Sequence, residues 1–397
     1  MASAPETRQP RLSAALREGE RVTPLELFFD LVFVLAITQC TALMVEHTTW
    51  PGLAQGLLVL GVLWWTWVAY SWLTSVVDPE EGAVRLVIFA AMAGLLIVAL
   101  CVPRAFDDLA LAFAVAYGAV RVAQIALFML ASRDDPALRS SVNGLAIGTA
   151  VGVTLLASAS LFDGVAQGAL WAVALGLDMA APYFFIDASG WKLAPGHFAE
   201  RHGLIIIVAL GESIVAIGIA AEFSLTVGIV SAAALGVALT AALWWIYFDI
   251  VALVAARRLA VAEIGRVQNE MARDSYSYLH FPMVAGIVLV ALGLEQTIAH
   301  VEDPLHTVPA FALLGGLAAY LLGHVAFRYR HIHTINRRRL TLAVVFLALL
   351  PLAIELPALA TLALVTLMLW TLIAIETRGY GEARHRVRHP EPEPSGP

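Results

Sequence analysis

Three ionisable side chains lie deep inside long apolar stretches of the sequence. Arg121, Asp178 and Glu212 each lie near the middle of a different stretch. With a helical rise of about 1.5 Å per residue, all three reach a similar depth, close to the centre of a bilayer. A charged group at that depth costs about 2.5–3.5 kcal/mol on insertion scales, so we expect each of them to have a fixed partner or a function.

Binding of a proton or a small cation is the chemistry open to this layer. If Arg121 pairs with one carboxylate, the other can take up a proton, because burial favours a neutral carboxyl group and a neighbouring cation favours a charged one. A structural ion pair that fixes helix packing is the alternative interpretation. Ser213 follows Glu212, and Thr38 and Gln39 are the matching polar positions near the start of the chain, so these three are candidate neighbours.

A second group of polar residues lies near the ends of the apolar stretches. Histidine titrates close to physiological pH, so an inner gate or a proton path is one interpretation. Helix capping and snorkelling of long side chains is the other. Asp30 lies within reach of Arg21 or Arg201, whereas Glu295 lies near the far end of its stretch and is expected to be solvated. The gate candidates are Glu26, Asp30, Glu200, Arg201, His202, His280 and His324.

Soluble enzyme and metal motifs are missing from the sequence. It has no HExxH, no Gly-x-Ser-x-Gly and, with a single lysine, no P-loop. His331 and His333 in RYRHIHTINRRR have no carboxylate or cysteine nearby, which favours a basic loop facing lipid over a metal site. We therefore predict no catalytic residue, no metal, no cofactor and no nucleic-acid partner.

The composition identifies the elements that must position these residues. Of the 397 residues, 60% are hydrophobic and 14% charged, and the mean hydropathy is +0.80. A soluble domain has roughly 25% charged residues, so a soluble globular enzyme is excluded. A membrane-spanning helix needs roughly 20 apolar residues. The sequence predicts an all-α membrane protein with twelve such helices, at about 27–45, 52–76, 83–102, 108–131, 141–161, 165–187, 203–221, 226–253, 278–300, 307–329, 339–356 and 358–376.

The basic residues predict how the chain sits in the membrane. Of the 24 lysine and arginine residues, all but Arg104 and Arg121 fall on the side of the N-terminus if there are twelve spans. Cytoplasmic loops carry such an excess, so both termini are predicted to be cytoplasmic, with anionic lipids as partners of the arginine-rich face. The polar residues 1–23 carry no cleavable signal peptide, and residues 377–397 are predicted to be disordered.

The two halves of the sequence resemble each other. ELFFDLVFVLAITQ followed by LVLGVLWWTWVAY matches ERHGLIIIVALGES followed by LGVALTAALWWIYF, and Trp64-Trp65 matches Trp244-Trp245. These matches predict two six-helix repeats, 24–190 and 191–376, which share one orientation because each contains an even number of spans. In transporters built from parallel repeats, the binding site lies between the halves near the midplane.

Three blocks of the sequence resemble the bacterial low temperature requirement A family. They are RVTPLELFFDLVFVLAITQ (21–39), ERHGLIIIVALGESIVAIG (200–218) and YSYLHFPMVAGIVLVALG (276–293). The resemblance implies a multi-pass inner-membrane protein whose name refers to growth in the cold, and it implies no reaction or substrate. It strengthens the case that Glu212 and the gate candidates within these blocks are functional, whereas Arg121 and Asp178 lie outside all three blocks.

Three functions fit these observations. A secondary transporter, coupled to protons, is favoured by the duplication and by Glu212, and Arg121 suggests that its small solute is anionic. A membrane-embedded enzyme acting on lipid or a lipid-linked substrate in cold or stress adaptation would suit the cluster of histidines and carboxylates. A non-catalytic sensor or scaffold is disfavoured because the short loops leave no room for a signalling domain.

Overall fold

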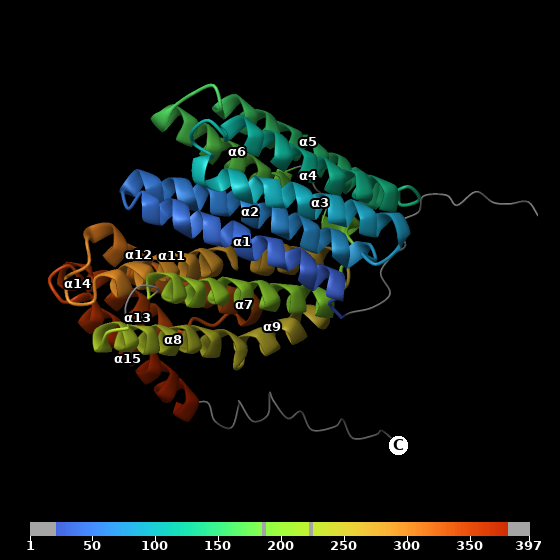
Figure 1. Cartoon of the computed structure of the whole chain (residues 1–397). Coiled ribbons are helices and arrows are strands. Elements are labelled where there is room, and N and C mark those ends of the chain that lie inside the picture. Colours follow the sequence, from blue (N-terminus) through green and yellow to red (C-terminus); the bar gives the residue numbers. More distant parts are fainter. Residues whose placement is uncertain (1–20, 185–187, 222–224, 380–397) are drawn as a thin grey trace, which may run out of the picture.

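The computed structural model describes residues 21–184, 188–221 and 225–379, and these are almost entirely helical (Figure 1). An isolated β bridge joins Pro304 and Pro357. The predicted all-α fold is confirmed, whereas most of the predicted terminal segments, 1–20 and 380–397, lies outside the described residues. The elements are α1 (Pro24–Glu46), α2 (Trp50–Val76), α3 (Gly82–Cys101), η1 (Val102–Arg104), α4 (Ala110–Ala131), α5 (Pro136–Ala159), α6 (Gly164–Phe184), η2 (Ala188–Gly190), α7 (Pro195–Ala220), α8 (Val227–Phe248), α9 (Val251–Ala260), α10 (Arg266–Ala272), η3 (Arg273–Tyr278), α11 (Phe281–Ala299), α12 (Thr307–Ile332), α13 (Arg337–Ala348), α14 (Leu350–Ala353) and α15 (Ala358–Gly379).

The number of long helices corrects one prediction. Among the described residues, 11 helices rather than twelve are long and apolar enough to cross a membrane. The stretch 339–356 was predicted as a single span, but it forms the short helices α13 and α14 with a break at Leu349. Pro351 explains the break, because a proline has no N–H to donate and its ring clashes with the preceding turn.

Helices α13 and α14 nevertheless extend between the two ends of the neighbouring helices α12 and α15. Their start lies beside the last turn of α15, where Asn336 Nδ2 donates to Glu376 Oε1 at 2.7 Å. Their far end reaches the loop between α11 and α12, where the N–H of Ala358 donates to the carbonyl of Asp303 at 2.8 Å. The chain therefore returns along α12 although the helix is interrupted.

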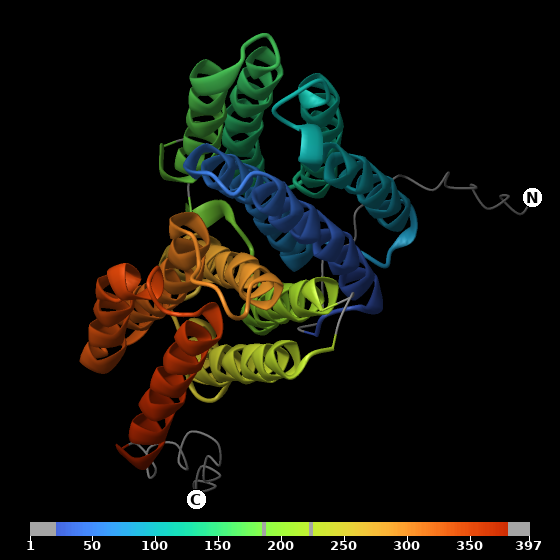
Figure 2. The same ribbon diagram turned by 60° about the vertical axis from the view of Figure 1, so that its left-hand side comes forward.

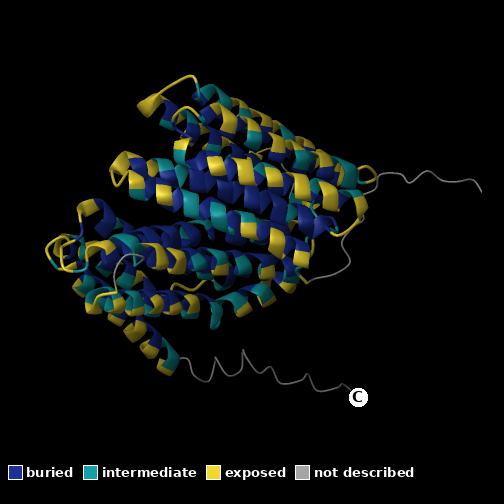
Figure 3. Ribbon diagram, viewed as in Figure 1, coloured by how far each residue is buried: buried dark blue, intermediate teal, exposed yellow. Residues whose placement is uncertain are grey.

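The pattern of burial is that of a helix bundle surrounded by lipid. Large apolar side chains are exposed along the outer faces of α3, α6 and α8, whereas α2, α11 and α12 are mostly enclosed (Figure 3). An apolar exterior of this extent is costly in water and suits the hydrocarbon core of a membrane. These helices therefore support the prediction of a multi-pass membrane protein.

Helices α11 and α12 pack with their backbones in contact, and glycine makes this possible. A Cβ atom added to Gly286 would lie 2.6 Å from the carbonyl oxygen of Gly316, and one added to Gly316 would lie 2.6 Å from that of Gly286. Small residues let membrane helices approach to backbone contact and gain van der Waals attraction. This helix pair is the rigid centre of the second half of the chain, α7–α15.

The first half, α1–α6, meets the second along α1 and α2, which contact α7 and α11 (Figure 2). The connection between the halves contains Lys192, whose Nζ lies 3.0 Å from Asp135 Oδ2. This hydrogen bond holds the pKa of the Asp135 carboxyl below its ordinary value. Lys192 itself remains 54% exposed. A half-exposed ion pair therefore holds the linker, whereas the main contacts between the two halves are buried.

Candidate functional site

An ion-pair cluster centred on Arg201 joins α1 to α7. The guanidinium donates from Nη1 to Glu26 Oε1 at 3.0 Å and from Nη2 to Asp30 Oδ1 at 2.7 Å. Trp67 Nε1 donates to the same Asp30 oxygen at 2.9 Å, and Thr74 Oγ1 accepts from Arg201 at 3.3 Å. All five side chains are at most 4% exposed. Of the two arginines predicted to reach Asp30, Arg201 does so, and we call this group the Arg201 cluster.

His197 completes the cluster and was missed from the sequence. Its Nε2 lies 2.7 Å from Glu26 Oε1, and its Nδ1 lies 3.3 Å from Ser75 Oγ. The available signal was its position four residues before Arg201, which places both side chains on one helix face. Glu26 Oε1 is therefore contacted by two basic side chains of α7, Arg201 and His197.

The predicted site residue Glu212 lies further along the same boundary. Thr38 Oγ1 on α1 donates to Glu212 Oε2 at 2.6 Å, and Glu212 is 2% exposed. Glu295 on α11 is close enough for the two carboxylates to interact electrostatically. Glu295 is partly buried rather than solvated as predicted, because α11 packs closely against α7. Two carboxyl groups thus share one region of the bundle.

The contacts on α1 show that it runs parallel to α7. On α1, Asp30 comes before Thr38. Their partners on α7, Arg201 and Glu212, follow in the same order. These separations are about 12 Å and about 16 Å of helix rise, in the same direction. The leading helices of the two halves therefore lie side by side and point the same way.

Arg121 and Asp178 form a separate pair within the first half. Arg121 Nη2 lies 3.4 Å from Asp178 Oδ2 and donates to Thr149 Oγ1 at 2.6 Å, and Tyr117 OH donates to Asp178 Oδ2 at 3.3 Å. Two guanidinium nitrogens of Arg121, Nε and Nη1, have no hydrogen-bond partner within the described part of the chain. Because the partners of Glu212 come from α1, the three predicted residues divide into two clusters rather than sharing one.

A buried array of histidines and tyrosines extends from the Arg201 cluster into the second half. The His202 ring lies 4.8 Å from the Trp67 ring and 5.2 Å from that of His280. His280 Nδ1 lies 3.1 Å from the carbonyl of Ser275 and must donate there, so its Nε2 accepts from Tyr247 OH at 2.9 Å. The predicted histidines therefore pack together, and one hydrogen bond between side chains links two helices.

The array ends at a second ion pair that was not predicted. Arg339 on α13 binds Glu376 on α15 through two hydrogen bonds, of 3.1 and 2.8 Å. Arg339 Nη1 lies 3.5 Å from Nδ1 of the predicted residue His324, whose ring is 5.7 Å from that of Tyr247. Buried histidine rings and one tyrosine thus extend between two buried arginine–carboxylate clusters.

Segment 273–278 is wound as a π-helix, a form that recurs at functional sites. The wider turn places both polar groups of Ser277 toward α2. Trp64 Nε1 donates to its carbonyl at 2.8 Å and Trp72 Nε1 donates to its hydroxyl at 3.0 Å. This segment belongs to the second half, so it adds two further contacts across the boundary.

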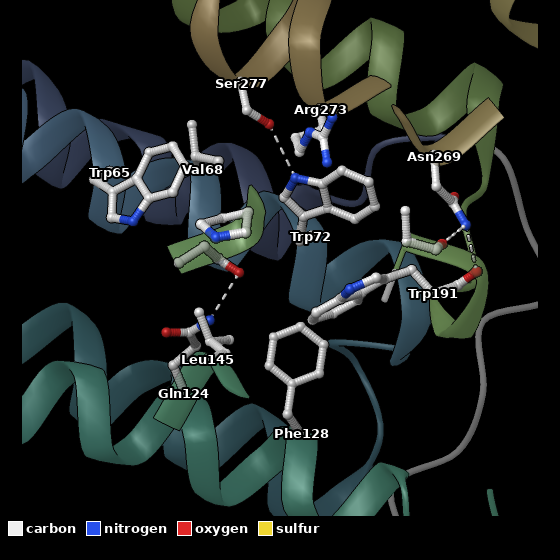
Figure 4. A pocket seen from close by; sticks show the side chains of 13 residues that line it. Trp65, Val68, Trp72, Gln124, Phe128, Leu145, Trp191, Asn269, Arg273 and Ser277 are labelled. Carbon is white, nitrogen blue, oxygen red and sulfur yellow. Dashed lines mark hydrogen bonds between the residues drawn. The ribbon is translucent and has the colours of Figure 1, made fainter. Parts of the chain in front are cut away.

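A cavity of about 60 Å³ opens beside this segment, between the two halves (Figure 4). The walls are mostly aromatic and apolar and come from α2, α4, α5, α6, residues 188–191 and the segment 266–278. Buried polar atoms in the wall that have no partner within the described chain are Gln124 Oε1, Trp65 Nε1 and Asn269 Oδ1. The residues labelled in Figure 4 are Trp65, Val68, Trp72, Gln124, Phe128, Leu145, Trp191, Asn269, Arg273 and Ser277.

The remaining predicted residues lie around these clusters. Ser213 is buried, and its hydroxyl has no partner in the described portion of the chain. Gln39 is partly buried on α1, whereas Glu200 is exposed and accepts from the N–H of Val22 at 3.1 Å. Over the described ranges, no group of three or more histidine, cysteine and acidic residues is arranged to hold a metal ion.

Comparison with known proteins places the chain beside one family. The family described as bacterial low temperature requirement A protein matches residues 21–374. A protein of Rhizobium meliloti (strain 1021), described as uncharacterized protein RA0937, is 32% identical over 309 residues, which cover 75% of each chain. No solved structure matches. The matched range includes every residue of the clusters above except Glu376.

Proposed function

The chain belongs to the bacterial low temperature requirement A family, and from this membership and the contacts above we propose that it is a secondary transporter that couples movement of a small solute to protons. The observation that carries the proposal is the placement of buried polar groups on the boundary between the halves. Glu26, Asp30 and Thr38 on α1 face Arg201 and Glu212 on α7. Contacts that join two halves can open and close as the halves move.

The packing order supports two parallel repeats. In the first half α1 contacts α3, α3 contacts α4, and α4 contacts α5; in the second, α7 contacts α11, α11 contacts α12, and α12 contacts α13. Parallel α1 and α7 suit two copies in one orientation. With α13 and α14 together as the twelfth crossing, the distribution of arginine supports the bacterial inner membrane with both termini in the cytoplasm.

Three of these features have a place in the proposed cycle. The Arg201 cluster holds the halves together near one end, and the tryptophan-lined cavity between the halves is where the solute binds. Glu212 carries the proton: Thr38 on α1 donates to it across the boundary, so this hydrogen bond breaks and the protonation of Glu212 changes when the halves separate. The cavity volume of about 60 Å³ limits the solute to a small molecule.

Proteoliposomes containing a pH-sensitive dye test this function. Solutes from several classes, such as short carboxylates, amino acids and amides, are added in turn, and we expect one class to change the internal pH. Glu212→Gln should abolish this proton movement, because an amide cannot release a proton, while exchange of the solute across the membrane persists. Glu46→Gln on the exposed end of α1 is the matched control and should behave like the parent.

Chemical labelling supplies a readout that needs no solute. A hydrophobic carbodiimide reacts with protonated carboxyl groups inside membranes, and mass spectrometry should locate the adduct at Glu212 in a pH-dependent manner. Proton movement unchanged by Glu212→Gln, or no dye response to any solute class, would refute the proposed coupling.

A further inference from the structure

A second and larger pocket lies where α8 bends into α9, enclosed by the ends of α12 and α15 and the start of α13. It has a volume of about 240 Å³ and combines polar and apolar walls. Three polar side chains in its wall are more than nine-tenths buried: His331, Asn336 and Arg339. We call it the rim pocket. It is separate from the cavity between the halves and from every contact used in the proposed transport cycle.

His331 points to a ligand in the rim pocket. The residue is only 7% exposed, and neither ring nitrogen has a hydrogen-bond partner anywhere in the described chain. The ring is fixed by Phe327, whose centroid is 4.7 Å away, and by Tyr276 at 5.9 Å. A buried polar group without a partner costs about 1–3 kcal/mol, so a bound molecule that hydrogen-bonds the imidazole would be stabilised there.

The electrostatics favour an anion. Arg328 and Arg339 line the pocket together with two acidic side chains, Asp249 and Glu376. Arg258 and Arg330 are also close enough to interact with the His331 ring, so arginines outnumber these two acids around it. Glu376 is occupied by its two hydrogen bonds with Arg339. Arginine presents a rigid fork of donors that matches phosphate oxygens, and it remains charged at all physiological pH values.

Part of the lining is apolar. Ile250, Val251 and Val254 at the bend between α8 and α9, and Ile373 of α15, line the pocket. Such a wall would repel a fully hydrated ion and would accommodate hydrocarbon. The pocket therefore suits an amphiphile with a charged head and an apolar body.

We propose that the rim pocket binds an anionic phospholipid, with its phosphate near Arg328 and His331 and its acyl chains leaving over Val251, Val254 and Ile373. Basic pockets between membrane helices on the cytoplasmic side are typical sites for anionic headgroups. The lipid would hold α9, α12 and α15 together at one end of the second half.

Thermal unfolding of the full chain in neutral detergent, followed by tryptophan fluorescence, tests the proposal. Phosphatidylglycerol should raise the unfolding temperature, whereas phosphatidylcholine, inorganic phosphate and glycerol phosphate should leave it unchanged. Removing one charge-assisted hydrogen bond should weaken lipid binding about tenfold, so Arg328→Gln and His331→Asn should each need correspondingly more phosphatidylglycerol. Arg337→Gln is the control, because it removes the same charge from an exposed position outside the pocket.

The outcomes are separable. Equal protection by phosphatidylcholine, or equal loss of affinity in Arg337→Gln, would contradict a specific headgroup site. Protection by free phosphate at matched concentration would overturn the lipid as the source of the anion. If the His331→Asn protein does not fold in the absence of lipid, the measurement on Arg328→Gln decides between these outcomes. Arg328 is only partly buried, so its substitution should leave the fold intact. None of these results depends on whether Glu212 couples transport to protons.

Discussion

Replacing Arg201 with alanine should lower the free energy of unfolding by about 3–5 kcal/mol, the largest loss that we expect from any single charged residue. The change leaves Glu26 and Asp30 buried and without their common cation, at most 3% exposed on the inner face of α1. Thermal unfolding of purified protein in detergent would measure the loss. Arg201→Lys should be intermediate, because an ammonium group cannot donate to both carboxylates through the arginine fork.

Arg104 supplies the matched control for that experiment. It forms an ion pair with Asp108, four residues away, but the two side chains are 60% and 55% exposed. Exposed pairs contribute about 0–1 kcal/mol, so Arg104→Ala should leave the unfolding temperature almost unchanged. If both variants lost equal stability, the Arg201 cluster would not hold the halves together.

Substitution of Gly286 by leucine should lower stability by about 3 kcal/mol or more and separate α11 from α12. The first atom of the new side chain would lie 2.6 Å from a backbone oxygen of Gly316, which cannot move without shifting the helix. Gel filtration and thermal unfolding in detergent should show loss of the folded species.

Gly176→Leu makes the same chemical change at an exposed position of α6. Nothing lies within 4 Å of a Cβ atom there. Leucine has a higher helix propensity than glycine by somewhat less than about 1 kcal/mol, so this variant should be at least as stable as the parent. A Gly286→Leu protein as stable as Gly176→Leu would show that the backbone contact between α11 and α12 is dispensable.

Much of the architecture could be predicted because the membrane makes the sequence simple to interpret. Each long helix follows from an uninterrupted apolar stretch, and the ion pair between Arg201 and Asp30 follows from their depth near the same end of two such stretches. The pairing of Arg121 with a carboxylate could be predicted for the same reason, because Arg121 and Asp178 lie at a similar depth. The eleventh predicted span, 339–356, was misjudged because hydropathy does not register the effect of Pro351 on backbone hydrogen bonds.

The contacts between distant helices could not be predicted. Glu376 lies at the end of a long stretch, and nothing in its neighbours indicates that Arg339 binds it. Glu212 and Arg121 lie at similar depths, but depth does not say which helices are adjacent, so the sequence left open whether they share a cluster. The π-helix at 273–278 has no periodicity that distinguishes it from an ordinary helix in so short a segment.

Lys192 provides a single cleavage site in the linker between the halves. It is the only lysine of the chain, and it lies in the non-helical stretch between η2 and α7 with its side chain half exposed. A lysine-specific protease can therefore cut the intact protein at one peptide bond, releasing residues 1–192 from 193–397. Since α1 and α7 are joined by buried ion pairs, we expect the two fragments to copurify in detergent, and the Arg201→Ala pair to come apart.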